Sequence, residues 1–282
     1  MLGFLNIYKE KNVTSSAIVT SIKKKFGVSK VGHMGTLDPM ACGLLPLAVG
    51  KATRLFDYFL QKTKVYTAIF DFGYETDSLD ITGNVYSCGG RVPTTEEIED
   101  TIKTMIGVQA QMPPKFSAKN VNGKRAYDLA RAGKDFELKS KEIELFRIDL
   151  IEQVDNNKFK FEIECSSGTY IRAIGRDIAY KLGTYATMSF LERSQMGVFD
   201  LNNSYKISEM TGDIEEYLIA PEEVFKSFEK LDIDQTQLKR LLDGRTIPEI
   251  EITKNTFVYC DGKLIGVATP TKELKLQTYL GE

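Results

Sequence analysis

The chain has 282 residues, of which 42% are hydrophobic and 27% charged, a composition typical of a folded protein with a large core and not of a disordered one. No apolar stretch approaches the roughly 20 residues needed to span a bilayer, and the start of the chain lacks a signal-like pattern, so we expect a cytoplasmic protein that spans no membrane. Because His33 is the single histidine, a multi-histidine metal site is excluded. The net charge of −2 disfavours a protein that coats nucleic acid non-specifically, unless cations cluster on one face of the molecule.

A strand and a helix are predicted to open the chain. Residues 2–8 alternate loosely between apolar and polar side chains, as a strand does. Thr14, Ser15 or Ser16 can cap a helix whose apolar stripe continues to Gly27, where glycine favours a helix end. Lysines in the last turn suit the helix dipole, and they form either a solvated face or a phosphate contact.

Residues 31–46 follow as a glycine-rich loop that presents one aspartate, Asp38. The glycines permit tight backbone turns, while Pro39 stiffens the loop and favours an extended conformation at Asp38. The apolar run at 44–49 predicts a buried strand that holds the loop at a sheet end. Asp38 is therefore either a turn cap, the usual role of an Asp-Pro aspartate, or a catalytic carboxylate, and the loop alone favours the cap.

A third strand is predicted at 64–72, where Tyr66 shares one face with several apolar side chains. A tyrosine in such a row is usually a packing residue, so Tyr66 read by itself belongs to the core. The next segment, 73–83, predicts a loop in which Asp77 and Asp80 cap turns; it has too few oxygen ligands for a calcium loop.

A polar insertion breaks the regular pattern at residues 113–142, after a helix that a Thr-x-x-Glu capping box opens at Thr94. Two prolines begin the insertion, and Phe116 and Tyr127 are interleaved with cations. The candidate RNA-binding cations are Lys115, Lys119, Lys124, Arg125 and Arg131. Because cations bind phosphates and rings stack on bases, the insertion fits a clamp on folded RNA, but its composition fits a solvated surface segment equally well.

Residues 143–150 and 158–165 predict a hairpin that leads into a glycine-containing junction with Tyr170 and Arg172. A cation near a helix start opposes the helix dipole, so Arg172 needs a partner, and a buried carboxylate would serve. The chain then continues through this helix and returns as a strand at 191–199.

The pattern of predicted elements changes from about residue 231, where short elements replace the long strands and helices. A short helix at 237–242 precedes two strands joined by Asp261-Gly262, the signal of a type I′ turn, so a small β-rich appendage is predicted. The four cysteines lie far apart without a C-x-x-C pair, so we expect buried, reduced thiols and neither disulfides nor zinc.

Four segments taken together resemble the bacterial TruB-type tRNA pseudouridine synthases. They are, in order, GHMGTLDPMACGLLPLAVGKATR, KVYTAIFDFGYETDSLDITG, PPKFSAKNVNGKRAYDLARAG and CSSGTYIRAIGRDIAYKLG. The likeness covers residues 1 to about 200, and the tail more weakly resembles the small PUA-type RNA-binding domain of these enzymes. It implies an α+β fold with a mixed, mainly antiparallel central sheet flanked by helices. It also implies a catalytic domain at 1–228 that contains the insertion, and a PUA-like domain at 229–282.

The resemblance implies that Asp38 is a nucleophile that isomerises uridine to pseudouridine at position 55 in the T loop of tRNA, without cofactor or metal. The other residues it implies are Tyr66 and Arg172 in catalysis and His33, Tyr66, Tyr170 and Leu191 in substrate binding. Arg172 would orient Asp38 and keep it ionised, Tyr66 would stack on the uracil and take its C5 proton, and His33 would fill the space of the flipped base. The expected partner is the T arm of tRNA, bound by a monomer.

The sequence departs from the family pattern at three positions. Glu10 and Asn12 replace a proline and a glycine near the start, and Asn120 replaces a lysine of the insertion, beside Lys119. Asparagine tolerates the left-handed conformation, so we expect the first turn to survive. Two other functions stay open: a tRNA-binding or folding chaperone, and a phosphatase-like hydrolase that would need a metal-binding carboxylate cluster, for which Asp77 and Asp80 are the candidates.

Overall fold

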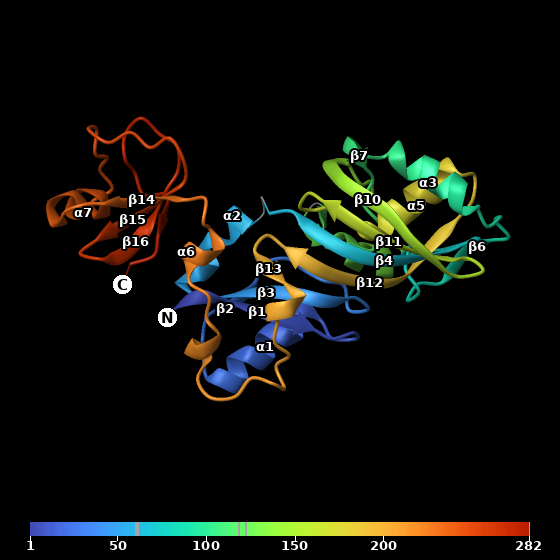
Figure 1. Cartoon of the computed structure of the whole chain (residues 1–282), viewed down its shortest axis with the longest axis horizontal. Coiled ribbons are helices and arrows are strands. Elements are labelled where there is room, and N and C mark those ends of the chain that lie inside the picture. Colours follow the sequence, from blue (N-terminus) through green and yellow to red (C-terminus); the bar gives the residue numbers. More distant parts are fainter. Residues whose placement is uncertain (60–61, 118, 122, 282) are drawn as a thin grey trace.

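The computed structural model describes residues 1–59, 62–117, 119–121 and 123–281 (Figure 1). Its main sheet contains β1 (Leu2–Lys9), β2 (Val31–His33), β3 (Cys42–Gly50), β4 (Lys64–Phe72), β7 (Gly107–Gln111), β10 (Lys141–Asp155), β11 (Lys158–Cys165), β12 (Ala186–Met196) and β13 (Phe199–Asp200). The strand order is β1-β3-β12-β4-β11-β10-β7, with β2 paired to β3 and β13 to β12. Within the described residues β3 and β12 pair in parallel and the other neighbours are antiparallel, which confirms the predicted mixed, mainly antiparallel sheet.

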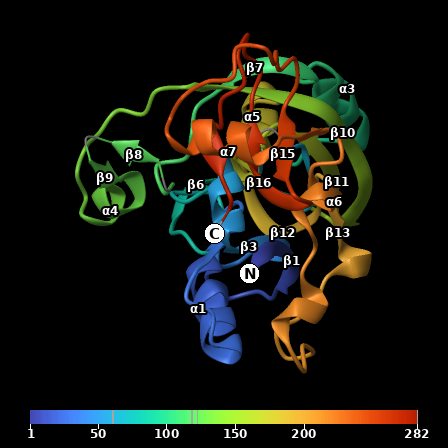
Figure 2. The same ribbon diagram turned by 90° about the vertical axis from the view of Figure 1, so that its left-hand side faces the viewer.

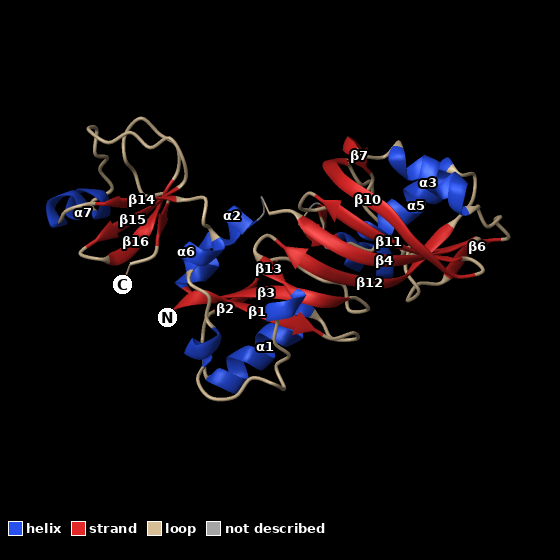
Figure 3. Ribbon diagram, in the orientation of Figure 1, coloured by secondary structure: helices blue, strands red, loops and turns tan. Residues whose placement is uncertain are grey.

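Three helices cover the main sheet (Figure 3). Helices α3 (Thr95–Lys103) and α5 (Ile171–Lys181) pack Ile98 and Ile174 into one apolar cluster with Phe70 and Phe161 from the central strands. Helix α1 (Ser15–Phe26) buries its apolar stripe against β1 and β3 in a second cluster. No helix among the described residues is long and apolar enough to cross a membrane.

Local chemistry explains where these helices begin and end. The Thr14 hydroxyl accepts a hydrogen bond from the Ala17 N–H at the start of α1, and Gly27 ends the helix in the left-handed region with φ 66°. Thr94 and Glu97 form the predicted capping box of α3.

Short elements connect the sheet and its helices. They are η1 (Lys51–Leu55), α2 (Phe56–Phe59), β5 (Tyr74–Thr76), β6 (Val85–Cys88), β8 (Asn120–Val121), β9 (Lys124–Arg125), α4 (Ala126–Arg131), η2 (Leu201–Asn203), η3 (Ile214–Tyr217) and α6 (Pro221–Val224). The insertion carries β8, β9 and α4, which lie to one side of the main sheet in Figure 2.

Several predicted boundaries were wrong. The strand predicted at 191–199 is β12, which already begins at Ala186 and stops at Met196, because Gly197 turns the chain with φ 58°. The loop predicted at 73–83 contains β5, which pairs with β6 as a small hairpin. Cys88 is exposed, although all four described cysteines are free as expected.

The C-terminal region is a four-stranded sheet of β14 (Glu229–Asp232), β15 (Thr256–Cys260), β16 (Lys263–Ala268) and β17 (Thr278–Tyr279), with α7 (Gln235–Leu242) beside it. Asp261 and Gly262 both have positive φ, 49° and 73°, which confirms the predicted primed turn between β15 and β16. Phe257 packs with Phe4 and Phe225 in an apolar cluster that joins this region to the main body. The predicted β-rich appendage is confirmed, whereas its PUA type and the boundary at 228 stay predictions.

Candidate active site

The loop between β2 and β3 holds Asp38 in a fixed backbone conformation. The Ser15 hydroxyl, at the start of α1, bonds to both the N–H and the carbonyl of Leu37 at 3.0 Å. The Asp38 carbonyl accepts a hydrogen bond from the Ala41 N–H at 3.1 Å. The Asp38 side chain remains 34% exposed, so the loop presents its carboxylate to solvent.

Lys9 ties this loop to the end of β1. Its side chain is fully buried, and burial lowers its pKa to about 8. Its Nζ donates to the carbonyls of Ala41 (2.6 Å), Val13 (2.8 Å), Glu10 (3.1 Å) and Pro39 (3.3 Å). Asn12 adopts the left-handed conformation with φ 64°, and its N–H donates to the Pro39 carbonyl. The prediction that this turn survives its sequence departures is confirmed.

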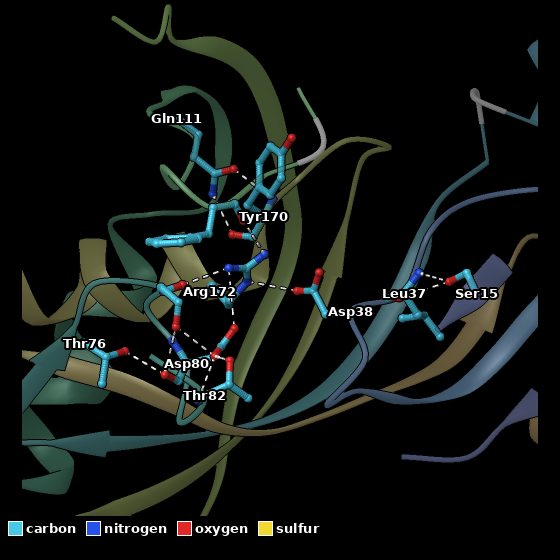
Figure 4. Close-up of polar contacts among 11 residues, drawn as sticks. Ser15, Leu37, Asp38, Thr76, Asp80, Thr82, Gln111, Tyr170 and Arg172 are labelled. Carbon is cyan, nitrogen blue, oxygen red and sulfur yellow. Dashed lines mark hydrogen bonds and ion pairs between the residues drawn. The ribbon is translucent and has the colours of Figure 1, made fainter. Parts of the chain in front are cut away.

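Arg172 reaches Asp38 from the first turn of α5 (Figure 4). Its Nε lies 2.9 Å from Asp38 Oδ2, and its Nη1 donates to the Ser78 carbonyl at 2.8 Å and lies 3.5 Å from Asp80 Oδ2. Arg172 is only 7% exposed. The prediction that this arginine needs a partner is confirmed, and it has two carboxylates.

Asp80 is held for this contact by its own turn. Its Oδ1 accepts hydrogen bonds from the Ser78 hydroxyl at 2.9 Å and from the Thr82 N–H at 2.9 Å, while Asp77 accepts from the Asn84 N–H at 3.0 Å. Both aspartates therefore cap turns as predicted, and Asp80 also faces Arg172. No group of three or more His, Cys, Asp or Glu side chains in the described part of the chain could hold a metal ion.

Tyr66 and Leu191 lie beside the Asp38 loop on the neighbouring strands β4 and β12. Both are buried and pack in one apolar cluster with Leu37 and Met40, which flank Asp38 on either side. Burial raises the pKa of the Tyr66 phenol, and the charge of Asp38 raises it further. Asp38 therefore pairs directly with Arg172, whereas Tyr66 and Leu191 share an apolar cluster with the residues around Asp38.

His33 ends β2, and Tyr170 precedes α5. The His33 Nδ1 is buried without a hydrogen-bond partner among the described residues, and burial together with the Arg193 charge lowers the pKa of the imidazole. The Tyr170 backbone is fixed through Gln111, whose amide accepts from the Tyr170 N–H at 2.8 Å and donates to its carbonyl at 3.1 Å.

The cations of the insertion are spread along its surface. Lys115, Lys124 and Arg131 are exposed, whereas the Nζ of Lys119 donates to the Lys139 carbonyl at 2.6 Å. The side chain of Arg125 lies outside the described residues. The insertion also touches the site, because Arg172 Nη2 donates to the Phe116 carbonyl at 3.1 Å.

Sequence reasoning missed three residues that shape this site. Lys9 was recognised only as the lysine that opens the N-terminal family motif, without a role, and Gln111 lay outside every recognised motif. Arg193 is 1% exposed and sits two residues after Leu191 on β12. A charged residue in the alternating pattern of a strand is a usable signal, because charged side chains are almost never fully buried unless they have partners.

Comparison with known proteins connects this geometry to a family. The family described as TruB family pseudouridylate synthase (N terminal domain) matches residues 23–171. The tRNA pseudouridine synthase B of Clostridium novyi (strain NT) is 38% identical over an aligned length of 289, gaps included, which covers 99% of this chain and all of that protein. The protein of the same name from Borreliella burgdorferi (strain ZS7) is 40% identical over 256 residues, covering 90% of this chain and 89% of that protein.

Solved structures agree on the fold. A chain in the crystal structure of a Cbf5-Nop10-Gar1 complex has a TM-score of 0.70 at 22% identity, covering 98% of this chain and 79% of that one. A chain in the structure of an H/ACA RNP bound to a substrate RNA containing 2'-deoxyuridine has a TM-score of 0.69 at 19% identity, covering 99% and 84%. The predicted α+β fold is confirmed over nearly the whole chain.

Proposed function

Because the chain belongs to the TruB family of pseudouridylate synthases, we propose that it isomerises uridine to pseudouridine at position 55 in the T loop of tRNA, with Asp38 as the catalytic carboxylate. The relatives named tRNA pseudouridine synthase B, matched along nearly their full length, support tRNA as the substrate. The observation that carries the role of Asp38 is its 2.9 Å ion pair with the buried Arg172.

The reaction breaks the glycosidic bond, turns the uracil and joins its C5 to C1′ of the ribose. Asp38 supplies a carboxylate that either attacks the substrate or takes a proton from the sugar, and both require the charged form. The Arg172 guanidinium pairs with this carboxylate and, held by the Ser78 carbonyl and Asp80, fixes its direction. A rigid loop and a rigid arginine preorganise the carboxylate before substrate arrives.

Tyr66 is proposed to stack on the uracil and to take the C5 proton in the last step. Its place on β4 supports this role, because Tyr66 shares an apolar cluster with Leu37 and Met40 of the Asp38 loop and its phenol feels the Asp38 charge. Leu191 would form the apolar wall of the same pocket, and Tyr170, fixed through its backbone, would contact the substrate.

The target base is stacked inside a folded loop, so it must leave the stack to reach Asp38. His33 is proposed to fill the vacated position, which suits the neutral ring that its lowered pKa favours. The insertion, through Lys115, Lys119, Lys124, Arg125 and Arg131, is proposed to bind the T arm, and the chain to act as a monomer without cofactor.

The proposal is tested with a tRNA transcript labelled with tritium at C5 of uridine. We expect wild-type protein to release tritium and to leave pseudouridine at position 55, with or without EDTA. A protein that binds the transcript but releases no tritium would be a chaperone and not a synthase. Deleting residues 115–134 should weaken tRNA binding and flatten its salt dependence, and an unchanged affinity would make the insertion ordinary surface.

A further inference from the structure

Arg193 is buried in the centre of the main sheet without an acidic partner. Its side chain is 1% exposed, and no ion pair among the described residues includes it. Burying an unpaired guanidinium is costly unless its N–H groups are bonded and its charge is used. The acceptors of its hydrogen bonds are the neutral carbonyls of Leu44 and Gly35, so no negative group neutralises its charge and the charge acts on the other side chains around it.

Two of its hydrogen bonds reach the loop that carries Asp38. Arg193 Nε donates to the Leu44 carbonyl at 2.8 Å, and Nη2 donates to the Gly35 carbonyl at 3.0 Å. Gly35 lies in the loop before Asp38, and Leu44 lies in the first residues of β3 after it. The guanidinium is therefore fixed in the same frame as the catalytic carboxylate.

Its third contact is Tyr66. Arg193 on β12 lies directly opposite Tyr66 on β4 in the strand register, so the two side chains lie on the same face of the sheet, where the Arg193 charge acts on the phenol. A guanidinium has N–H donors and no acceptor, so a hydrogen bond between the two side chains would be accepted by the phenol oxygen. Such a bond strengthens as the phenol loses its proton, because the acceptor then becomes negative.

The other charged or titratable groups that act on Tyr66 oppose its ionisation. Asp38 from the loop and Cys165 from β11 both raise the pKa of the phenol, as burial does, whereas the Arg193 charge lowers it. A buried phenol without Arg193 would thus be a poor base near neutral pH.

We propose that Arg193 is a positioning residue for the last step of the reaction, where it holds the Tyr66 oxygen and stabilises the phenolate that accepts the C5 proton. This inference rests on the proposed function. Once C5 is bonded to C1′, its proton passes to the Tyr66 oxygen and the C–H electron pair forms the C5=C6 double bond. The electron pair displaced from the C6=N1 bond goes to N1, which takes a proton from water.

The test compares Arg193→Met and Arg193→Lys with wild type in single turnovers on tRNA that carries hydrogen or deuterium at C5 of the target uridine. We expect Arg193→Met to slow the reaction roughly 10- to 100-fold, a part of the 10²–10⁴ that a positioned base contributes. Proton removal should become rate-limiting, so a primary deuterium isotope effect should appear or grow, and the rise of rate with pH should move to higher pH. Arg193→Lys should lie between the two.

Two further measurements separate positioning from packing. In a Tyr66→Phe background the Arg193 substitutions should add no isotope effect, because their target is gone. If thermal unfolding shows that Arg193→Met is not folded, the comparison of Arg193→Lys with wild type is the test. A folded variant that is slower with an unchanged isotope effect and pH profile would overturn the inference and leave the proposed function intact. Failure of wild type to make any pseudouridine would overturn the proposed function itself.

Discussion

Replacing Arg172 by lysine should show how much of the catalysis depends on a fork-shaped cation. The arginine contacts Asp38 at 2.9 Å, the Ser78 carbonyl at 2.8 Å, the Phe116 carbonyl at 3.1 Å and Asp80 at 3.5 Å, from three different nitrogens. One ammonium group cannot occupy all these positions, so Arg172→Lys keeps the charge but loses the direction of the Asp38 contact.

The size of the effect follows from that contact. Losing a hydrogen bond to a charged group costs about 1.5–3 kcal/mol, which is roughly a 10- to 150-fold loss in kcat/KM if it is felt only in the transition state. Tritium release from tRNA measures this loss, and tRNA affinity should change little because Asp38 acts after binding.

Arg176 provides a matched control one turn along α5. It pairs with Asp177 at 2.7 Å and donates to the Met112 carbonyl, away from Asp38. Arg176→Lys should keep near-wild-type turnover. If both lysine variants lose activity equally, or if Arg172→Lys is fully active, the argument that Arg172 orients Asp38 is refuted.

Three other features of the fold lead to separate predictions. Lys9→Met removes the donor for four carbonyls and should lower the free energy of unfolding, measured by urea titration, by about 3 kcal/mol or more. The control Lys24→Met, at an exposed position on α1, should change it little. Equal stabilities of the two variants would contradict the role of Lys9. Gly43→Ala places a Cβ 2.4 Å from the Arg193 carbonyl, whereas Gly107→Ala, at a similar φ, meets nothing within 4 Å, so Gly43→Ala should cost about 1–3 kcal/mol more. NMR titration should give His33 a pKa below the ordinary histidine value of 6.5. Because the unfolded chain then binds a proton that the folded chain does not, the free energy of unfolding should fall as the pH drops below 6.5, and by more in wild type than in His33→Gln. A pKa above 6.5 would contradict this.

The elements that were predictable are those set by neighbours in sequence. The Thr94 capping box, the Gly27 helix end and the Asp261-Gly262 turn each depend on a few adjacent residues, and each was found where its pattern lies. The strand predicted at 191–199 runs through the turn at Gly197, and the β5–β6 hairpin is made of two very short strands, so the apolar pattern within each segment misplaced both.

The same distinction holds in the site. The dipole argument at Arg172 correctly called for a partner, for which a buried carboxylate would serve, but it could not say that Asp80, 92 positions earlier, would share the arginine with Asp38. Likewise the four carbonyls around Lys9 come from two separate loops. Long-range convergence of this kind is decided by the whole fold, and a single sequence carries little trace of it.

The central claim, that Asp38 performs the chemistry, is tested most directly by Asp38→Asn on tRNA labelled with tritium at C5 of uridine. The amide keeps the shape of the side chain and removes its charge. The account predicts near-normal tRNA binding with no tritium release and no pseudouridine. Near-normal turnover by this variant would contradict it.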